Sequence, residues 1–374
     1  MKKADIGIVG GGIAGLTAAI HLASCGLKVL LFEKEKYPHH KVCGEYLSRE
    51  ILPYLKSLNI SLESLQPKII DQLLYSTPSG KTIKTDLKSG GFGISRYALD
   101  NYLYEKAKEQ NVDIIHQTVT NTTFENEFFE IRTFENQAFP TKIVLGAFGK
   151  RSGLDKKLNR QFIEKKSGWL AVKAHYKLDD YPNNRVSLHN FKGGYCGLSK
   201  TETDSVNVCY LASYESFKNY KSIDSYKEEV LCRNPQLKTF FHEAVPLFET
   251  DLSIAQISFE KKSLVEDHIL MLGDAAGLIH PLCGNGMAMA FHSAKLASES
   301  ILKYYNPNAF SRTDIEKEYI KKWDQQFKSR MKIGSALQKI LLKPFLAEAS
   351  QNIIKIIPSL LPFIIAKTHG KPVI

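Results

Sequence analysis

The chain has 374 residues, of which 43% are hydrophobic and 24% are charged. These proportions exclude a long disordered chain and predict one large core or two closely joined domains. Lysine and arginine outnumber aspartate and glutamate by 50 to 39, and the net charge of +11 favours anionic cofactors or anionic membrane surfaces. No nucleic-acid motif accompanies this charge, so we expect no nucleic-acid partner.

The cysteines are scattered, and none of them forms a C-x-x-C pair or another spacing typical of metal ligands. We therefore predict no bound metal, and reduced thiols in a cytoplasmic protein. Residues 4–9 form an apolar run that is too short for a secretion signal. No stretch reaches the roughly 18 apolar residues that a membrane-spanning helix needs.

Residues 4–34 predict a strand, a glycine turn, a helix and a second strand, which together form a βαβ unit. The turn matches G-x-G-x-x-G, in which Gly10 permits the tight turn and Gly12 lets the backbone approach a pyrophosphate. Gly15 allows close packing of helix on strand, and the helix start at Ile13 and Ala14 turns its N–H groups toward the phosphates. The segment therefore predicts a dinucleotide site.

Glu33 stands at the end of the second strand, next to Lys34, which is a further candidate for cofactor contact. The Glu33 carboxylate can accept hydrogen bonds from ribose hydroxyls, and it would repel a 2′-phosphate. This position disfavours NADP and leaves FAD and NAD open.

Further along the chain the pattern changes. Residues 95–110 predict a helix with Ser95 as its N-cap. Alternating apolar and polar runs typical of an antiparallel sheet, with one helical interruption at 222–244, occur at residues 169–176, 185–191, 195–199 and 205–212. Residues 269–272 predict a buried strand that returns to the first domain, and helices are expected at 286–304 and 313–342.

A second glycine-rich string follows that return strand. It comprises Gly273, Asp274, Ala275, Ala276 and Gly277, then Pro281, then Gly284, Gly286 and Met287. The string resembles the second FAD motif of flavoprotein hydroxylases of the p-hydroxybenzoate hydroxylase type and of geranylgeranyl reductases. The resemblance implies that Asp274, beside Gly273, binds a ribityl hydroxyl of FAD. It also implies that Gly284, Gly286 and Met287 bring a helix start to the flavin pyrimidine edge, where its N–H groups stabilise negative charge.

Two more segments carry the resemblance. Residues 41–48 resemble the K-x-C-G-x-x-L-S segment of geranylgeranyl-reductase-like proteins, which implies that Cys43 and Gly44 contact the flavin. Cys43 is also a candidate for chemistry on the substrate, with a buried filler as the alternative. The R-x-x-L-D segment at Arg96 implies a contact of that arginine with FAD, and Val119 falls where the family contacts adenine.

Tyr195 lies where these reductases and the related flavin halogenases carry a glycine–aromatic–tryptophan segment, so it is a candidate for lining a substrate cavity. His280 is a candidate acid or base near the flavin edge, with a structural histidine as the alternative. The chain departs from its relatives at Phe148, which replaces an aspartate of the hydroxylases, and no tryptophan accompanies Tyr195. The lysine that halogenases use is not identifiable, so the reductase branch is favoured.

The C-terminal tail, residues 337–366, is rich in leucine and isoleucine, is divided by prolines and is flanked by lysines. Three interpretations stay open for it: a membrane-surface anchor, a lid over an apolar substrate tunnel, or packing on the protein's own surface.

We therefore predict an α/β fold in which a Rossmann-like FAD-binding domain carries an inserted antiparallel β-sheet substrate domain and a C-terminal helical segment. The expected ranges are 1–75, 95–165 and 262–305 for the first domain, 76–94 and 166–261 for the second, and 306–374 for the helices.

The favoured function is FAD-dependent reduction of carbon–carbon double bonds in a lipophilic, isoprenoid- or polyketide-like substrate. There are two alternatives. The first is an FAD-dependent monooxygenase, which would hydroxylate or epoxidise its substrate with O₂ and NAD(P)H. The second is a membrane-associated flavin electron carrier. No second dinucleotide motif is visible, so the electron donor is NAD(P)H that binds transiently or a redox protein. We expect a cytoplasmic protein, or one peripheral to the inner face of the membrane.

Overall fold

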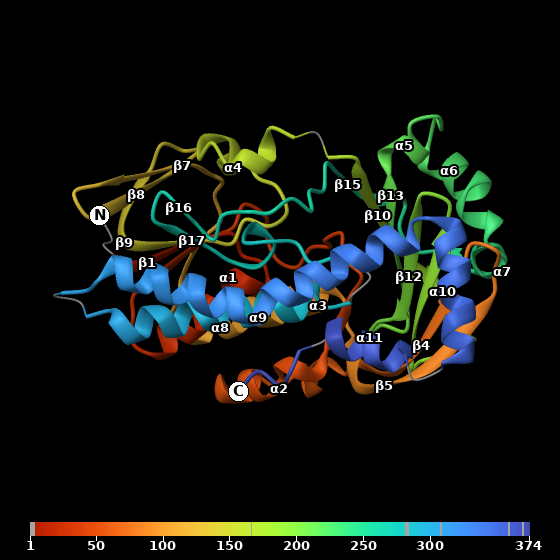
Figure 1. Cartoon of the computed structure of the whole chain (residues 1–374). Coiled ribbons are helices and arrows are strands. Elements are labelled where there is room, and N and C mark those ends of the chain that lie inside the picture. Colours follow the sequence, from red (N-terminus) through yellow and green to blue (C-terminus); the bar gives the residue numbers. More distant parts are fainter. Residues whose placement is uncertain (1–3, 166, 281–283, 307–308, 358–359, 369) are drawn as a thin grey trace.

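The computed structural model describes residues 4–165, 167–280, 284–306, 309–357, 360–368 and 370–374 (Figure 1). Pro281, part of the second glycine-rich string, lies outside these residues. Two sheets stand at opposite ends of the molecule, and the long helix α9 (Arg312–Leu341) runs from one to the other.

The first sheet contains the predicted βαβ unit. Its strand order is β16-β17-β9-β1-β2-β6, and the hairpin of β7 and β8 joins it through β9. The strands are β1 (Ala4–Val9), β2 (Val29–Phe32), β6 (Asp113–Ile115), β7 (Val119–Glu125), β8 (Phe128–Thr133), β9 (Ala138–Gly146), β16 (Val265–Glu266) and β17 (Ile269–Met271). β1 pairs in parallel with both β2 and β9, and β17 pairs in parallel with β9, which confirms the predicted return strand.

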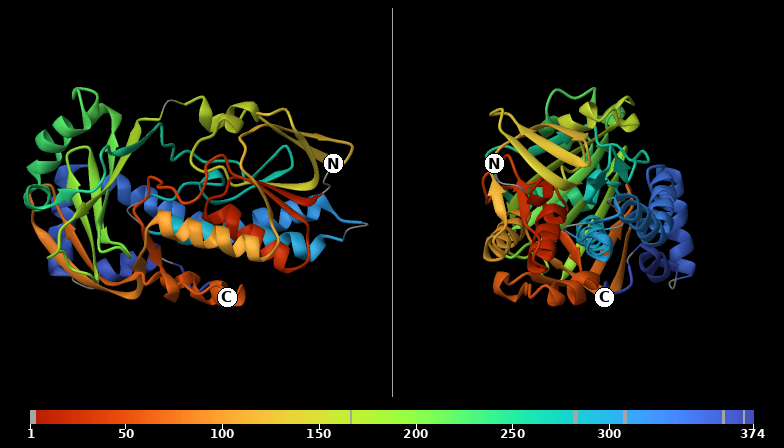
Figure 2. Two further views of the ribbon diagram at one scale, coloured as in Figure 1. Left: turned by 180° about the vertical axis from the view of Figure 1, so that it is seen from behind. Right: turned by 90° about the vertical axis from the view of Figure 1, so that its left-hand side faces the viewer.

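Helices cover this sheet because its parallel strands are apolar on both faces. α1 (Ile13–Ser24) packs between α3 (Arg96–Glu109) and α8 (Gly286–Tyr304), and α9 packs on α8 (Figure 2). Ser95 caps α3 as predicted, because its side chain accepts a hydrogen bond from the N–H of Ala98 at 3.0 Å. The shorter helices are α2 (Leu52–Ser57), α4 (Gly153–Lys157), α5 (Tyr214–Phe217), α6 (Ile223–Glu229) and α7 (Pro235–Glu243).

The second sheet has the order β14-β10-β13-β12-β11-β4-β5-β3, with β15 beside β10. Its strands are β3 (Tyr46–Ser48), β4 (Lys68–Ser76), β5 (Thr82–Gly93), β10 (Trp169–Lys177), β11 (Arg185–Phe191), β12 (Gly194–Lys200), β13 (Val206–Ser213), β14 (Val245–Pro246) and β15 (Leu252–Ala255). The neighbours among β10 to β13 are antiparallel, as predicted, whereas β11 and β4 are parallel.

The two faces of this sheet have different partners. Alternate residues of β10, such as Leu170 and Val172, join a core with Tyr226 and Leu237 of the α6–α7 region. The residues between them, such as Ala171, face the other side. This period of two confirms the expected covered face and leaves the opposite face toward the first sheet.

β3 and β4 belong to the second sheet although their residues were expected in the FAD-binding domain. Residues 68–76 carry no turn signal that marks a change of domain, and the parallel pairing of β4 with β11 joins segments more than a hundred residues apart in sequence. We keep the domain ranges as a proposal with these strands moved to the second domain.

The chain ends in two helices that pack beside the second sheet, α10 (Pro344–Ile356) and α11 (Leu360–Thr368). Within the described parts of the chain, none of the helices is both long enough and apolar enough to cross a bilayer.

Candidate functional site

A cavity of about 1260 Å³ lies between the two sheets. It brings together predicted site residues from segments far apart in the sequence. The predicted site residues that line it are Gly10, Gly12, Ile13, Ala14, Glu33, Lys34, Cys43, Gly44, Arg96, Val119, Tyr195, Gly273, Asp274, Gly284, Gly286 and Met287. Gly15 and His280 do not line it.

The glycine turn leaves room for a phosphate. A Cβ built on Gly15 would lie 1.9 Å from the carbonyl oxygen of Gly10, so Gly15 is required for the close approach of α1 to the turn. A Cβ on Gly12 would point into the cavity, with Arg96 Nη2 at 3.5 Å and Lys41 Nζ at 4.0 Å as its nearest neighbours. The open space at Gly12 and the two cations beside it fit a diphosphate.

A buried carboxylate orients these cations. Arg96 donates from Nε and Nη2 to the two oxygens of Asp100, both at 2.7 Å, and Lys41 Nζ lies 3.1 Å from Asp100 Oδ2. Burial alone would raise the pKa of Asp100, but the charges of Arg96 and Lys41 outweigh it and lower the pKa. The bidentate pair fixes the guanidinium at the cavity wall. Lys41 was not among the predicted site residues, although it begins the K-x-C-G segment.

Glu33 lies beside the glycine turn and binds its backbone. Its Oε2 accepts a hydrogen bond from the N–H of Gly11 at 2.9 Å, and its Oε1 accepts one from the N–H of Glu35 at 3.1 Å. A carboxylate has about four acceptor positions, so capacity for ribose hydroxyls is left on the cavity side.

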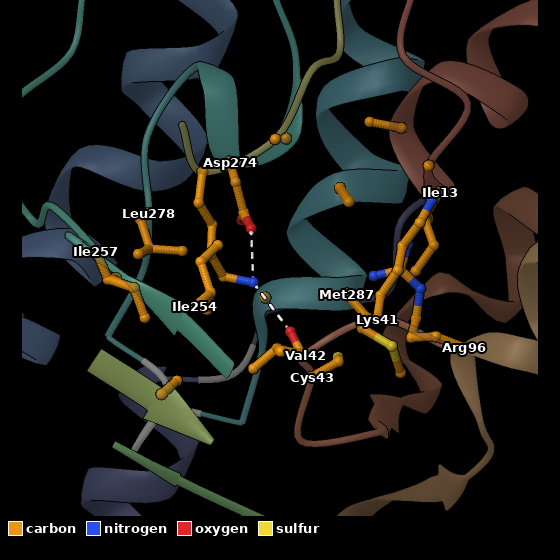
Figure 3. A pocket seen from close by; sticks show the side chains of 18 of the residues that line it. Ile13, Lys41, Val42, Cys43, Arg96, Ile254, Ile257, Asp274, Leu278 and Met287 are labelled. Carbon is orange, nitrogen blue, oxygen red and sulfur yellow. Dashed lines mark hydrogen bonds and ion pairs between the residues drawn. The ribbon is translucent and has the colours of Figure 1, made fainter. Parts of the chain in front are cut away.

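Asp274 lies across the cavity from the glycine turn (Figure 3). Lys150, four residues after the end of β9, places its Nζ 3.6 Å from Asp274 Oδ2 and donates to the carbonyl of Val42 at 3.2 Å. Beneath them Lys262 donates to the carbonyls of Asp274 and Lys150 at 2.8 and 2.9 Å, and burial lowers the pKa of Lys262 to about 8. The two lysines therefore hold three distant segments together. Lys150 was also missed, although it lies two residues after Phe148, where the chain departs from the hydroxylases.

The start of α8 forms another part of the wall. Gly286 begins the helix, and a Cβ added there would meet nothing within 4 Å. The free N–H groups of a helix start carry partial positive charge, so this end of α8 can stabilise an anion in the cavity.

Beyond Cys43 the cavity becomes apolar. Figure 3 shows Ile254, Ile257 and Leu278 gathered on the side away from Ile13, Lys41 and Arg96, with Val42 and Cys43 between the two groups. Further apolar lining residues are Leu73, Leu87, Ala171, Val186, Leu188, Leu198, Leu211, Leu252 and Ile365. The inner face of the second sheet supplies many of them, and Ile365 comes from α11.

His280 is buried behind Tyr195. Their ring centroids are 5.7 Å apart, and the ring of Phe259 lies 4.8 Å from the His280 ring on another side. Burial lowers the pKa of His280 to about 3, so the side chain is neutral near pH 7 and is a poor proton donor. The position favours the structural interpretation of His280 over the acid.

A buried charge network backs the cavity wall at Glu45. The Glu45 carboxylate accepts hydrogen bonds from Lys173, from His175 and from the N–H of Arg96, the last two at 2.7 Å. Ligand atoms of His40, Glu45 and His175 lie within 4.8 Å of one another, a spacing that could suit a metal ion. The Lys173 ammonium ion already neutralises Glu45 and would repel a cation, so we interpret the group as a structural ion-pair network.

The βαβ turn, the acid after β2 and the second helix start around one cavity define the chain as a dinucleotide-binding flavoprotein. The family model described as "FAD binding domain" matches residues 3–312, and the chain belongs to this family. Its cofactor is accordingly FAD, and it is a flavoprotein of the oxidoreductase class.

The chain is similar to proteins with different names. It is 22% identical to conditioned medium factor receptor 1 of Dictyostelium discoideum, over 94% of this chain and 73% of that one. It is 26% identical to digeranylgeranylglycerophospholipid reductase of Methanocaldococcus jannaschii, over 91% of this chain and 87% of that one. The structure of flavin-dependent brominase Bmp2 superposes with a TM-score of 0.77 at 18% identity, over 98% of this chain and 94% of that one, which shows a shared fold.

Proposed function

We propose that the protein reduces carbon–carbon double bonds of a lipophilic substrate. The observation that carries this proposal is the cavity, in which a polar, cationic end for the cofactor continues into a chamber lined by aliphatic side chains. When bound and reduced, FAD would supply a hydride to one carbon of the double bond, and the other carbon would take up a proton. The similarity to digeranylgeranylglycerophospholipid reductase supports a substrate of isoprenoid type.

The chain's own residues provide binding and orientation. Arg96 and Lys41 would bind the diphosphate, Glu33 the adenosine ribose and Asp274 the ribityl chain. Cys43 and Gly44 would lie along the flavin ring and mark the border of the substrate chamber.

The helix start at Gly286 would stabilise the negative charge of the reduced cofactor. The aliphatic wall at Ile254, Ile257 and Leu278 would exclude water from the reacting double bond. NAD(P)H or a redox protein would supply the electrons.

The test uses the purified, FAD-loaded protein. It is reduced with dithionite under anaerobic conditions, excess reductant is removed, and geranylgeraniol is added as a polyunsaturated probe. We expect the flavin absorption of the oxidised cofactor to return, with one double bond reduced for each FAD reoxidised. Reoxidation by a quinone or a redox protein, but by no unsaturated lipid, would support the electron carrier instead.

A further inference from the structure

The helix α10 presents its largest apolar side chains to the outside. It packs on the turn between β4 and β5 through Glu348, which pairs with Lys81 at 3.3 Å, and through Gln351, which donates to the carbonyl of Lys81 at 2.8 Å. Phe345 and Ile356, on the other side of the helix, are each 80% exposed. A surface helix normally buries its apolar face and exposes its polar face, whereas α10 buries Gln351 and exposes Phe345 and Ile356.

The exposed apolar surface extends beyond α10 to the neighbouring helix. The large apolar side chains that are exposed along the described parts of α10 and α11 are Phe345, Leu346, Ile353, Ile356, Ile357 and Phe363. We call these six side chains the apolar stripe. They lie on two helices at the outer surface beside the second sheet (Figures 1 and 2). Large apolar side chains exposed together on neighbouring helices are typical of an interaction site.

The charge of the segment that carries the apolar stripe is mainly positive. Residues 332–374 contain six lysines and one acidic residue, Glu348, whose carboxylate is already paired with Lys81. Lys339, Lys343 and Lys367 are exposed in this region. Apolar side chains flanked by lysines match a membrane surface, in which acyl chains take up the former and anionic headgroups attract the latter.

One of these two helices, α11, also reaches the substrate chamber. On α11, Phe363 is 58% exposed, whereas Ile365 lines the cavity and packs against the cluster of Tyr46, Leu73 and Leu87. One short helix therefore separates the aliphatic chamber from the apolar stripe.

We propose that α10 and α11 dock on an anionic lipid bilayer, and that α11 is the entrance through which a lipid chain passes from the bilayer into the cavity. The entrance role rests on the proposed function, whereas the docking role stands on the surface alone. The sequence left a membrane-surface anchor and a lid over the substrate tunnel as alternatives. In this proposal α11 serves as both, with one face toward the bilayer and the other toward the cavity.

The docking role is tested by sedimentation of the FAD-loaded, full-length protein with vesicles. We expect the protein to sediment with vesicles that contain about 30% phosphatidylglycerol, and less with pure phosphatidylcholine or at high salt. The double substitution Phe345→Ser and Ile356→Ser should reduce the bound fraction at least 10-fold. A control with Phe134→Ser, at a site 78% exposed on the first domain, should bind like the wild type.

Equal sedimentation of the stripe variant and the wild type would overturn the docking role. So would a wild type that ignores both kinds of vesicle and forms a dimer that the double substitution dissociates, because a second copy would then cover the stripe. Circular dichroism of the variant checks that it is folded.

The entrance role is tested with geranylgeraniol, whose arrival beside FAD is followed by the difference spectrum of the flavin. Ile365→Trp should slow uptake from vesicles at least 10-fold without changing sedimentation, and Ala366→Trp, at an exposed neighbouring position, should not. Equal uptake by both variants would overturn the entrance role. A wild type that shows no spectral change with geranylgeraniol, from vesicles or from detergent, would contradict the proposed substrate, while sedimentation still decides the docking role.

Discussion

The glycine turn gives the sharpest test of how the chain holds its cofactor. In Gly12→Ala the new methyl group would have only Arg96 Nη2 at 3.5 Å and Lys41 Nζ at 4.0 Å nearby, which are ordinary contacts. The backbone of Gly12, at φ −85° and ψ −174°, is also accessible to alanine. Alanine lowers the entropy of the unfolded chain, which stabilises the protein, but it caps the helix less well than glycine, which destabilises it. Because these two effects oppose each other, the free energy of unfolding should change by less than about 1 kcal/mol.

FAD binding should respond quite differently. The methyl group fills the space through which a phosphate approaches the N–H groups of α1, and one or two charged hydrogen bonds of about 1.5–3 kcal/mol each are lost. We therefore expect the Kd for FAD to rise about 100-fold. Flavin fluorescence titration measures the affinity, and urea unfolding of the protein without FAD measures stability.

Two matched variants complete the comparison. Gly15→Ala should lose both stability and FAD, because its Cβ would lie 1.9 Å from the Gly10 carbonyl oxygen. Gly168→Ala, where nothing lies within 4 Å, should change neither. If Gly12→Ala bound FAD like the wild type, the phosphate would not lie at this turn.

The remaining predictions concern single side chains. Arg96→Lys replaces a bidentate guanidinium with a point charge and should weaken FAD binding about 10-fold in the same titration; an unchanged Kd would place the diphosphate elsewhere. Burial lowers the pKa of His189 to about 3. Below pH 6.5 this histidine is therefore protonated in the unfolded chain but stays neutral in the folded chain, and the free energy of unfolding falls. Between pH 7 and pH 5 the wild type should lose about 2 kcal/mol more than His189→Gln in urea unfolding, whereas the exposed-site variant His242→Gln should behave like the wild type. His280→Gln should leave the shape of the pH–rate profile unchanged, and a lost alkaline limb would restore His280 as a catalytic acid.

The elements that the sequence predicted well are specified locally. The turn at residues 10–15, the cap at Ser95 and the return strand at residues 269–271 each follow from neighbouring residues, and the structure confirms all three. The alternation along β10 likewise predicted one covered face of the second sheet.

The parts that the sequence did not predict depend on distant contacts. The buried pair of Lys173 and Glu45 joins residues 128 positions apart, and Lys150 reaches Val42 across 108 positions. Single lysines of this kind have no periodic or motif signal, because their role is set by the side chain opposite them in space. The pairing of β4 with β11 likewise depends on segments far apart in the sequence, so the range expected for the first domain, 1–75, did not anticipate it.

The central claim is that the reduced cofactor hydrogenates a lipid double bond in an aliphatic chamber. The most direct measurement is mass spectrometry of the lipid product formed by the FAD-loaded enzyme with geranylgeraniol, a continuous electron supply and an atmosphere of ¹⁸O₂. The account predicts a product heavier by two hydrogens for each reduced bond and free of ¹⁸O. A product that carries ¹⁸O would contradict it and would make the protein an oxygenase.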